Sequence, residues 1–276
     1  MDGTRREAFI NYLILIAFAV IVVGPMVGIA SRALDGEVQR FGPAGVEIID
    51  RFGLQAFYRA WEQGRLATSL TTSFILAVGI TAAALIPSIL AGCALGSRSF
   101  RGANVVLLVI LLGIILPVET LLIPLFYGLR AIGLTDTFLG VGLPHVAMMV
   151  PFGVFWMRAF FRSLPRSIIE AATMDGAGSW ATLWQVLVPS GRPAILTLIA
   201  LFFTWSWNSY LVFLVLAPGQ KVFPVTLSLT AFVGQRQTDE GAQAAVSLII
   251  SIPVVLVYLF LQRHFIRGVL SGAVKG

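Results

Sequence analysis

Six apolar runs, each long enough to cross a lipid bilayer, constrain this chain more than any other feature of its sequence. They lie at about residues 9–30, 67–95, 104–126, 138–161, 193–216 and 242–265. A helix needs about 20 apolar residues to cross the hydrocarbon core, and only helices and closed barrels satisfy their backbone hydrogen bonds there. The runs therefore predict an all-α, polytopic membrane protein with six transmembrane helices, built as one transmembrane domain over residues 1–276.

Prolines within or beside these runs predict that the helices form a kinked bundle, because proline removes a backbone donor and crowds the preceding turn. They are Pro25, Pro87, Pro117, Pro124, Pro151 and Pro253. The first run follows Arg5 and Arg6, as the core of a signal peptide would. Its length of about 22 residues exceeds a signal core, so we expect an uncleaved span.

The composition excludes several other classes of protein. Only 12% of the residues are charged, where soluble domains have about a quarter. The net charge of +6 is scattered between apolar runs, which does not favour nucleic acid as a partner. Cys93 is the single cysteine, and His145 and His264 share no ligand spacing with it, so we expect neither a disulfide nor a metal site.

Basic residues predict the orientation of the spans. The side with both termini, the 96–103 loop and the 158–192 loop has eleven arginines and lysines and a net charge of +7. The opposite side, which includes the long 31–66 loop, has a net charge of 0. Because cytoplasmic loops are enriched in Lys and Arg, we expect both termini in the cytoplasm. The 31–66 loop is then external, and Phe57, Tyr58 and Trp61 favour a short helix over 55–64 that lies at the membrane interface or docks a partner.

The predicted cytoplasmic loop at 162–192 has the pattern of two short helices. Ser163 is a candidate cap for the first, with Pro165 in its opening turn. Gly176 and Gly178 allow a break, and Ser179 is a candidate cap for the second. The second helix has an apolar face at i, i+3, i+4 and i+7, and Pro189 and Pro193 end it. That face is Trp180, Leu183, Trp184 and Leu187.

The physical pattern leaves the partner of this loop open. An amphipathic helix lying on lipid usually has a basic polar face, and residues 179–188 contain no lysine or arginine. A protein contact is therefore favoured. Glu170 could also form an i, i+4 pair with Arg166, worth a few tenths of a kcal/mol.

The run EAATMDGAGSWATLWQVLVP at 170–189 resembles the cytoplasmic loop of binding-protein-dependent ABC importer permeases, whose pattern places a glycine after Glu-Ala-Ala and a proline after the next helix. Further similarity to the carbohydrate subgroup, of the maltose-type smaller permease, lies in GLTDT at 133–137, residues 160–165, SWN at 206–208, Gln262-Arg263 and the last five residues. The resemblance covers nearly the whole chain and is weakest over residues 1–50.

The resemblance implies partners and roles for particular residues. The loop would form coupling helices that sit in a groove on one of two cytoplasmic ATPase subunits, which hold ATP and Mg²⁺. A second permease, in a heterodimer, and an extracytoplasmic substrate-binding protein would complete an importer in the bacterial inner membrane that works by alternating access. The implied contact residues in the loop are Glu170, Ala171, Ala172, Asp175, Gly176, Trp180, Leu183, Trp184, Leu187 and Pro189. A second implied contact with the ATPase pair is the tail formed by Gly272, Ala273, Val274, Lys275 and Gly276.

The chain shows no catalytic pattern of its own. It has no G-x4-G-K-[ST] phosphate loop, and no paired carboxylates or Ser/His/Asp arrangement. We therefore expect a transport subunit that binds no cofactor and is not an enzyme by itself.

Candidate substrate contacts are few. Glu119 is the only acidic residue inside a run, and an intramembrane carboxylate is a functional candidate because lipid exposure costs about 2.5 kcal/mol or more. Trp205, Trp207, Asn208 and Tyr210 could recognise a sugar, through rings and an amide, or could pack within the bundle. His145 is expected to be a packed or interfacial residue rather than a proton relay.

The substrate class is a sugar, with glycerol-3-phosphate or a polyol-like solute as the alternative. No basic residue lies in the middle of a run, which favours a neutral sugar. A self-contained secondary transporter would have several intramembrane ionisable groups and an internal repeat, which this sequence lacks. A membrane anchor or receptor would not explain the glycine-hinged loop.

Overall fold

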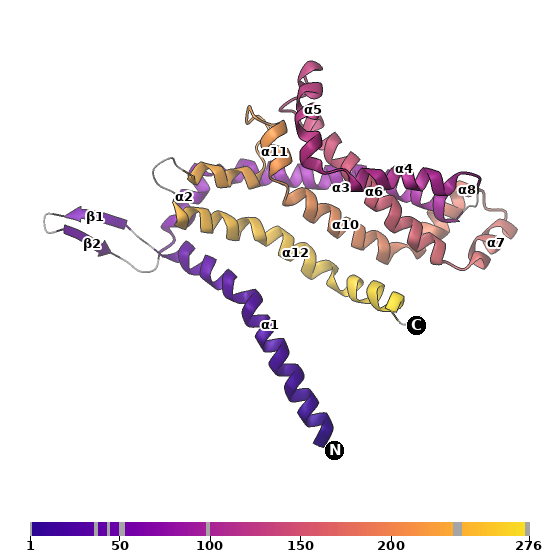
Figure 1. Cartoon of the computed structure of the whole chain (residues 1–276), viewed down its shortest axis with the longest axis horizontal. Helices are drawn as coiled ribbons and strands as arrows, with labels where there is room; N and C mark the ends of the chain where they lie inside the picture. Colours follow the sequence, from indigo (N-terminus) through magenta and orange to yellow (C-terminus); the bar gives the residue numbers. More distant parts are fainter. Residues whose placement is uncertain are drawn as a thin grey trace. The chain divides into compact units, whose positions relative to one another are not determined.

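The structure is a computed structural model that describes residues 2–35, 38–42, 45–49, 53–97, 100–233 and 239–273 (Figure 1). Side chains are described within 7–35, 53–97, 100–233 and 239–262. The chain divides into two compact units, one made of 1–69 and 228–252 and the other of 70–227 and 253–276. The all-α fold is confirmed, with one short β-hairpin inside the 31–66 loop that the sequence did not predict.

The first unit contains α1 (Asp2–Leu34), the hairpin of β1 (Val38–Gly42) and β2 (Gly45–Ile49), α2 (Gln55–Gln63) and the start of α12 (Glu240–Ala273). The predicted helix at 55–64 is thus confirmed as α2. The spanning part of α1, Glu7–Leu34, has apolar side chains on all faces and none of its most apolar stretch is buried within the chain. A helix that is apolar all round faces lipid or another protein.

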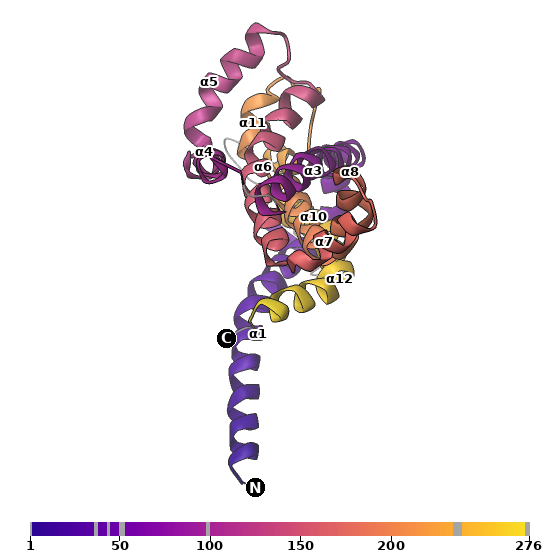
Figure 2. The same ribbon diagram turned by 90° about the vertical axis from the view of Figure 1, so that its right-hand side faces the viewer.

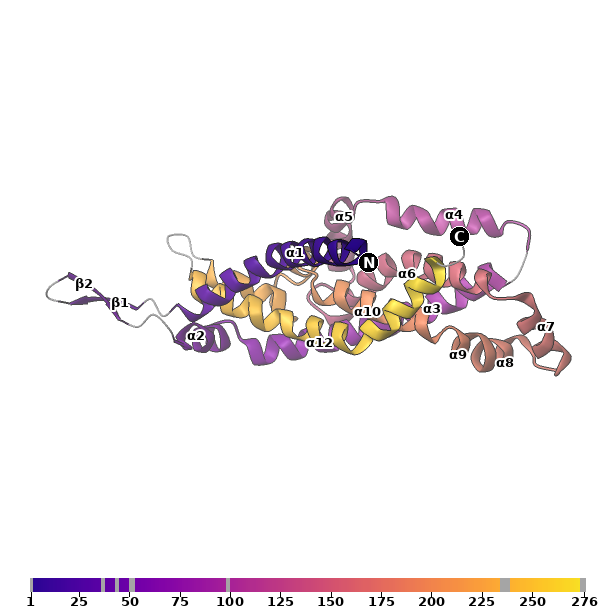
Figure 3. The same cartoon turned by 90° about the horizontal axis from the view of Figure 1, so that it is seen from below.

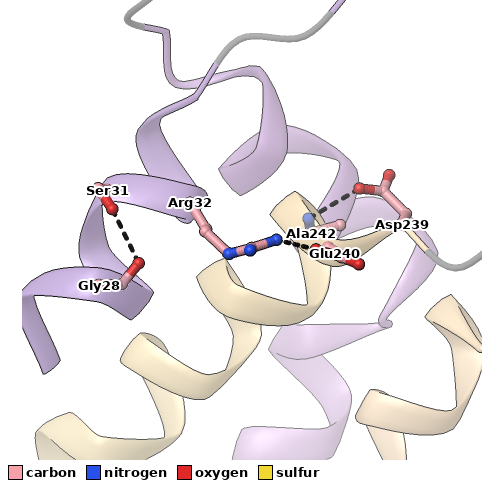
Figure 4. A network of polar contacts seen from close by, with 6 residues as sticks. All are labelled: Gly28, Ser31, Arg32, Asp239, Glu240 and Ala242. Carbon is pink, nitrogen blue, oxygen red and sulfur yellow. Dashed lines mark hydrogen bonds and ion pairs between the residues drawn. The ribbon is translucent and has the colours of Figure 1, made fainter. Parts of the chain in front are cut away.

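Ion pairs tie the elements of the first unit together (Figure 4). Arg32 of α1 pairs with Glu240 at the start of α12. Arg59 of α2 donates two hydrogen bonds to Asp239, at 2.7 Å and 3.2 Å. Asp239 also accepts the backbone N–H of Ala242 at 2.9 Å, and so caps the first turn of α12.

The second unit is built on α3 (Leu66–Ser97), α4 (Ala103–Ile115), α5 (Val118–Ala131), α6 (Phe138–Ser163), α10 (Arg192–Trp207) and α11 (Leu211–Leu216). Helix α6 contacts α4, α10 and α11. The core of this unit includes Met157, Phe161, Leu198 and Phe202. Four helices of the described chain are long and apolar enough to cross a membrane, and the number is six if each of two bent helix pairs is one span.

Two predicted spans are interrupted, in agreement with the kinked bundle that the prolines predict. The 104–126 run divides into α4 and α5, which meet at 90° (Figure 2). Leu116 is extended there because the ring of Pro117 disfavours a helical conformation in the residue before it. The 193–216 run divides at residues 208–210 into α10 and α11. Pro25, Pro87, Pro144, Pro151 and Pro253 all lie inside continuous helices.

Glycine allows α3 and α6 to approach closely in the second unit. A Cβ added to Gly92 would lie 2.5 Å from the Cβ of Met157, and one on Gly96 would lie 2.8 Å from the Arg158 carbonyl oxygen. Gly92 and Gly96 form a G-x-x-x-G pattern, which in membranes lets two helix backbones pack together.

We predict that Gly92→Val lowers the thermal midpoint of the purified chain, because overpacking a close contact costs about 1–3 kcal/mol. Gly79→Val on the same helix is the control, since a Cβ at Gly79 has no neighbour within 4 Å. Thermal unfolding followed by circular dichroism in detergent measures both. Equal midpoints for the two variants would show that the glycine contact is not important for stability.

A second prediction concerns pH. Burial alone would raise the pKa of Asp239, but the hydrogen bonds from Arg59 and from the Ala242 N–H together outweigh it and lower the pKa. A lowered pKa in the folded state stabilises the fold above the unfolded pKa of about 4. That stabilisation is lost as the pH falls below about 4 and through the lowered pKa.

The thermal midpoint of the wild type is therefore expected to fall in this acid range by more than that of Asp239→Asn. At neutral pH, Asp239→Asn retains a capping side chain and should cost under about 1 kcal/mol, because this pair is partly exposed. Asp239→Ala loses the cap as well and should cost about 1 kcal/mol more. Identical acid dependence in wild type and Asp239→Asn would contradict the assignment.

Candidate functional site

The loop between α6 and α10 in the second unit forms two short helical segments (Figure 3). The first is α7 (Arg166–Met174), and the second runs through α8 (Ser179–Ala181), the π-helix η1 (Thr182–Leu187) and α9 (Val188–Ser190). We call residues 166–190 the α7–α9 segment. Two helices were predicted here, and two helical segments are found.

The predicted caps of these helices are wrong. Ser163 is the last residue of α6, where its hydroxyl donates to the Phe160 carbonyl at 2.7 Å. Helix α7 follows Pro165 without a side-chain cap, and Ser179 is the first residue of α8 rather than the residue before it. Pro189 lies inside α9 and does not end it, whereas Pro193 lies in the first turn of α10.

Helix α7 presents most of its surface to solvent. Glu170 and Ala171 are exposed, and only Ala172 is buried, at 7%. Within the part of the chain that the structure describes, the Glu170 carboxylate takes part in no ion pair, so the alternative role of Glu170, a pair with Arg166, is not seen. The carboxylate is therefore available to a partner.

Gly176 ends α7 in a Schellman motif. Its φ of +78° lies in the left-handed region, which glycine adopts without a steric penalty. The Gly176 N–H donates to the Thr173 carbonyl at 3.0 Å, and the Ala177 N–H donates to the Ala172 carbonyl at 2.9 Å. These two bonds satisfy carbonyls that the helix end leaves without a partner. The predicted break at Gly176 is thus a specific turn that fixes the direction in which the chain leaves α7.

The predicted apolar face of the second helix is divided between two surroundings. Leu183 and Leu187 are buried at 6% and 2%, and they belong to the core that contains Phe161. Trp180 and Trp184 are exposed at 66% and 38%, with their rings edge to face at 5.7 Å. The leucines therefore anchor this helix to the spans, while the tryptophans face outward.

The π-helix explains why the i, i+3, i+4, i+7 pattern wrongly predicted a single apolar face. A π-helix bonds i to i+5 and turns less per residue than an α-helix, so residues 180 and 184 align separately from 183 and 187. Pro189 has no N–H for the carbonyl of residue 185 and would crowd it in a regular α-helix. The wider π turn directly before Pro189 relieves this conflict.

One large, exposed apolar residue of the segment was missed. Met174, the last residue of α7, is 88% exposed. Its position directly before the Gly176 turn could have predicted this exposure, because an apolar side chain at the tip of a loop has no core to pack into. Met174, Trp180 and Trp184 are thus three exposed apolar side chains of this segment, and exposed apolar side chains of this size are suited to a protein contact.

Gly191 and Trp156 determine how the end of the α7–α9 segment joins α10. Gly191 lies at the 77° bend between the second helical segment and α10. A Cβ there would lie 3.1 Å from both the Leu187 carbonyl oxygen and the ring of Phe160. The Trp156 Nε1–H of α6 donates to the Ala194 carbonyl of α10 at 3.0 Å.

The aromatic residues proposed for the substrate pathway differ in accessibility. Trp207 is 2% exposed and stacks on Phe203, with ring centroids 5.6 Å apart, so it is part of the packing of the second unit. Trp205 and Tyr210 are 42% and 39% exposed, and Asn208 is also exposed. The structure thus leaves three of the four available to a ligand.

Ser209 fixes the helix break next to these residues. Its hydroxyl lies 2.9 Å from Nε2 of His145, and its carbonyl accepts the Thr226 hydroxyl at 2.7 Å. His145 is buried, stacks on Phe213 and has its Nδ1 2.9 Å from the Val141 carbonyl. Since that carbonyl can only accept, Nδ1 is the donor, and Nε2 accepts from Ser209 in the neutral ring. His145 is thus a packed, hydrogen-bonded residue, as predicted.

Glu119 lies in the first turn of α5, directly after the break at Pro117. Its side chain is exposed within this chain, and a carboxylate in this position is favoured by the positive end of the helix dipole. In the tail, Val274, Lys275 and Gly276 lie outside the described residues, and only the backbone is described for Gly272 and Ala273. Among the described residues no group of three His, Cys, Asp or Glu side chains could hold a metal ion.

Comparisons with known proteins place this architecture in a family. The chain is 30% identical over 278 aligned positions to the diacetylchitobiose uptake system permease protein NgcG of Streptomyces coelicolor, covering 99% of this chain and 91% of NgcG. It is 33% identical to the osmoprotective compounds uptake permease protein GgtD of Synechocystis, covering 82% and 76% of the two chains. It is also 33% identical to the trehalose transport system permease protein SugB of Mycobacterium tuberculosis, covering 79% and 81%.

A solved bacterial ABC transporter involved in the import of the acidic polysaccharide alginate has the same fold, with a TM-score of 0.77, 24% identity and coverage of 96% of this chain and 98% of that one. Residues 88–271 match the family model of the binding-protein-dependent transport system inner membrane component. That range includes the whole α7–α9 segment and all spans from the end of α3 onward. The chain is therefore a member of this family, a membrane-embedded permease component of a binding-protein-dependent transport system.

Proposed function

We propose that this chain is a permease subunit of an ATP-driven importer that moves a sugar across the bacterial cytoplasmic membrane by alternating access. The family membership supports the transport role. The names of similar proteins support a sugar, because they include permeases for diacetylchitobiose, trehalose, arabinooligosaccharides and alpha-glucosides. Both termini are cytoplasmic in this proposal, as the distribution of basic residues favours.

The observation that supports ATP coupling most strongly is that the α7–α9 segment has both buried and exposed apolar side chains. Buried Leu183 and Leu187 attach it to the spans, while Met174, Trp180 and Trp184 are exposed. The sequence has no phosphate loop, so ATP and Mg²⁺ are held by partners. We propose that the exposed surface, with Glu170, docks on one of two cytoplasmic ATPase subunits and transmits their closure to α6 and α10.

The other partners follow from the same family assignment. A second permease, in a heterodimer, completes the pathway, and an extracytoplasmic binding protein delivers the substrate. The tail at Gly272–Gly276 is proposed as a further contact with the ATPase pair. In the pathway, Trp205, Asn208 and Tyr210 are proposed sugar contacts because they are exposed beside the helix break. Trp207 would act only by packing, and Glu119 is a weaker candidate.

A polyol-like or glycerol-derived solute is the second candidate substrate. The similarity to GgtD, an osmoprotective compounds uptake permease, favours keeping it. The thermal shift of the cognate binding protein, measured against a panel of mono- and oligosaccharides, polyols and glycerol-3-phosphate, separates these classes. Stabilisation by sugars alone supports the proposal, and stabilisation by glycerol-3-phosphate alone overturns the sugar assignment.

We predict that Trp180→Ala combined with Trp184→Ala weakens copurification of the ATPase subunit at least tenfold and abolishes transport. Central aromatic residues often contribute 2 kcal/mol or more to an interface. Both side chains are exposed, so insertion and thermal stability should change little. Trp61→Ala on α2 is the matched control for copurification, since Trp61 is 51% exposed and lies in the predicted external loop, on the side opposite the ATPase. Normal transport and copurification in the double variant would refute the docking surface.

Gly176 allows a separate test, of geometry rather than contact area. Gly176→Val forces a β-branched residue into the left-handed region, which is strained, although a Cβ there would meet no neighbour within 4 Å. We expect Gly176→Val to lower ATPase copurification and transport. Gly176→Asn should retain more of both, because asparagine tolerates this conformation. If the two variants behave alike, the turn geometry is not what matters at this position.

A further inference from the structure

A basic cavity lies in the second unit. It is lined by the end of α3, the start of α4, the end of α6 and the start of α7. Its volume is about 520 Å³, within the range of small-molecule sites. Three arginines line it: Arg158 and Arg162 from α6, and Arg166 from α7. None of the described residues that line the cavity is acidic. Three positive charges without a carboxylate between them repel one another and favour an anion.

The arginines are held in different ways. Arg158 is partly buried, and its guanidinium donates to the Leu95 carbonyl at 3.3 Å and to Asn104 Oδ1 at 3.4 Å. These bonds attach it to α3 and α4. Arg162 and Arg166 are exposed, and within the described chain neither takes part in an ion pair. One arginine is thus fixed by the fold, and two are available to a ligand.

The lining of the cavity combines basic and apolar side chains, which suit the anionic head group and the acyl chains of a membrane lipid respectively. Apolar side chains from Phe100, Val105, Phe161 and Ile169 line it beside the arginines. Val105, Leu108 and Val109 of α4 are all more than 60% exposed, and no residue of α4 is buried. An apolar helix without buried residues faces lipid or another protein. If α4 faces lipid, acyl chains lie directly beside the cavity.

The depth of the cavity also fits a lipid head group. The part of α6 from Phe138 to Met157 contains about 20 residues without an Asp, Glu, Lys or Arg, which spans about 30 Å as a helix. Arg158 and Arg162 follow at once. The cavity therefore lies where the hydrocarbon core ends and the phosphate groups of lipids begin. The first turn of α4, at Ala103–Val105, adds the positive end of a helix dipole.

We propose that this cavity binds the phosphate of an anionic membrane phospholipid, with its acyl chains along α4. Arg162 and Arg166 donate to the phosphate oxygens, and Arg158 supplies a fixed positive charge behind them. Basic cavities between transmembrane helices are suited to such head groups. Because Arg166 and Ile169 belong to α7, the bound lipid contacts the start of the α7–α9 segment.

Lipid binding by the full purified chain tests this, measured by native mass spectrometry during titration with phosphatidylglycerol or with phosphatidylcholine of the same acyl chains. The wild type should bind phosphatidylglycerol more tightly, and added salt should weaken that preference. Arg162→Gln with Arg166→Gln should lower the affinity for phosphatidylglycerol by about fivefold for each arginine. Binding of phosphatidylcholine should not change.

Two further variants distinguish the cavity from the general charge of the chain and from a loss of folding. Arg192→Gln removes an exposed arginine that does not line the cavity, and should leave the preference intact. Asn104→Asp places a negative charge in the cavity while keeping an acceptor for Arg158, and should lower the affinity even if the double variant does not fold. The proposal is overturned if Arg192→Gln loses as much affinity for phosphatidylglycerol as the double variant does. It is also overturned if neither the double variant nor Asn104→Asp loses affinity.

Inorganic phosphate separates a lipid from a soluble anion. If millimolar phosphate displaces phosphatidylglycerol and raises the thermal midpoint of the wild type by as much as the lipid does, the cavity binds a free anion and the lipid assignment fails. If the double variant loses ATPase copurification but keeps its lipid preference, the arginines belong to a protein contact, which also overturns the proposal.

Discussion

Lipid offers no hydrogen-bond partner to a backbone, so every place where an apolar helix stops must be satisfied by the protein itself. The break at 208–210 shows how this is done. The Asn208 N–H bonds back to the Thr204 carbonyl at 3.0 Å, the Ser209 carbonyl accepts the Thr226 hydroxyl, and the Ser209 hydroxyl meets His145. Side chains from two distant parts of the second unit thus stabilise one short interruption.

Hydropathy predicted where the spans lie but not where they break. The 104–126 and 193–216 runs are apolar on both sides of their interruptions, so a measure of polarity alone shows nothing at 116–117 or at 208–210. Proline was an ambiguous guide, because Pro117 marks a 90° bend while Pro87 and Pro253 lie within continuous helices. What decides the outcome is whether neighbouring segments replace the lost bonds, and that depends on contacts distant in sequence. His145 and Thr226 could not be connected to Ser209 in advance.

The candidate site shows the same limit at shorter range. The positions of Glu170, Gly176 and the second helix could be predicted, because a turn glycine and an amphipathic pattern are local properties. The direction of each side chain could not, because the α-helical period was assumed across a segment that adopts a π-helix before Pro189. Buried Leu183 and exposed Trp184 are neighbours in one predicted stripe. Met174 was missed because it does not belong to the i, i+3, i+4, i+7 pattern from which the apolar face was predicted.

The separation of anchor from contact surface has a mechanical consequence. A docking element transmits force only if it is attached firmly on one side and accessible on the other. Leu183 and Leu187 pack into the core with Phe161, near the end of α6, whereas Trp180 and Trp184 are exposed. In the proposed coupling role, displacement of the tryptophans would move the end of α6 rather than bend a flexible loop. Arg158 and Arg162 lie on that same end of α6, so a ligand in the basic cavity would contact the end of the helix that the α7–α9 segment is proposed to move.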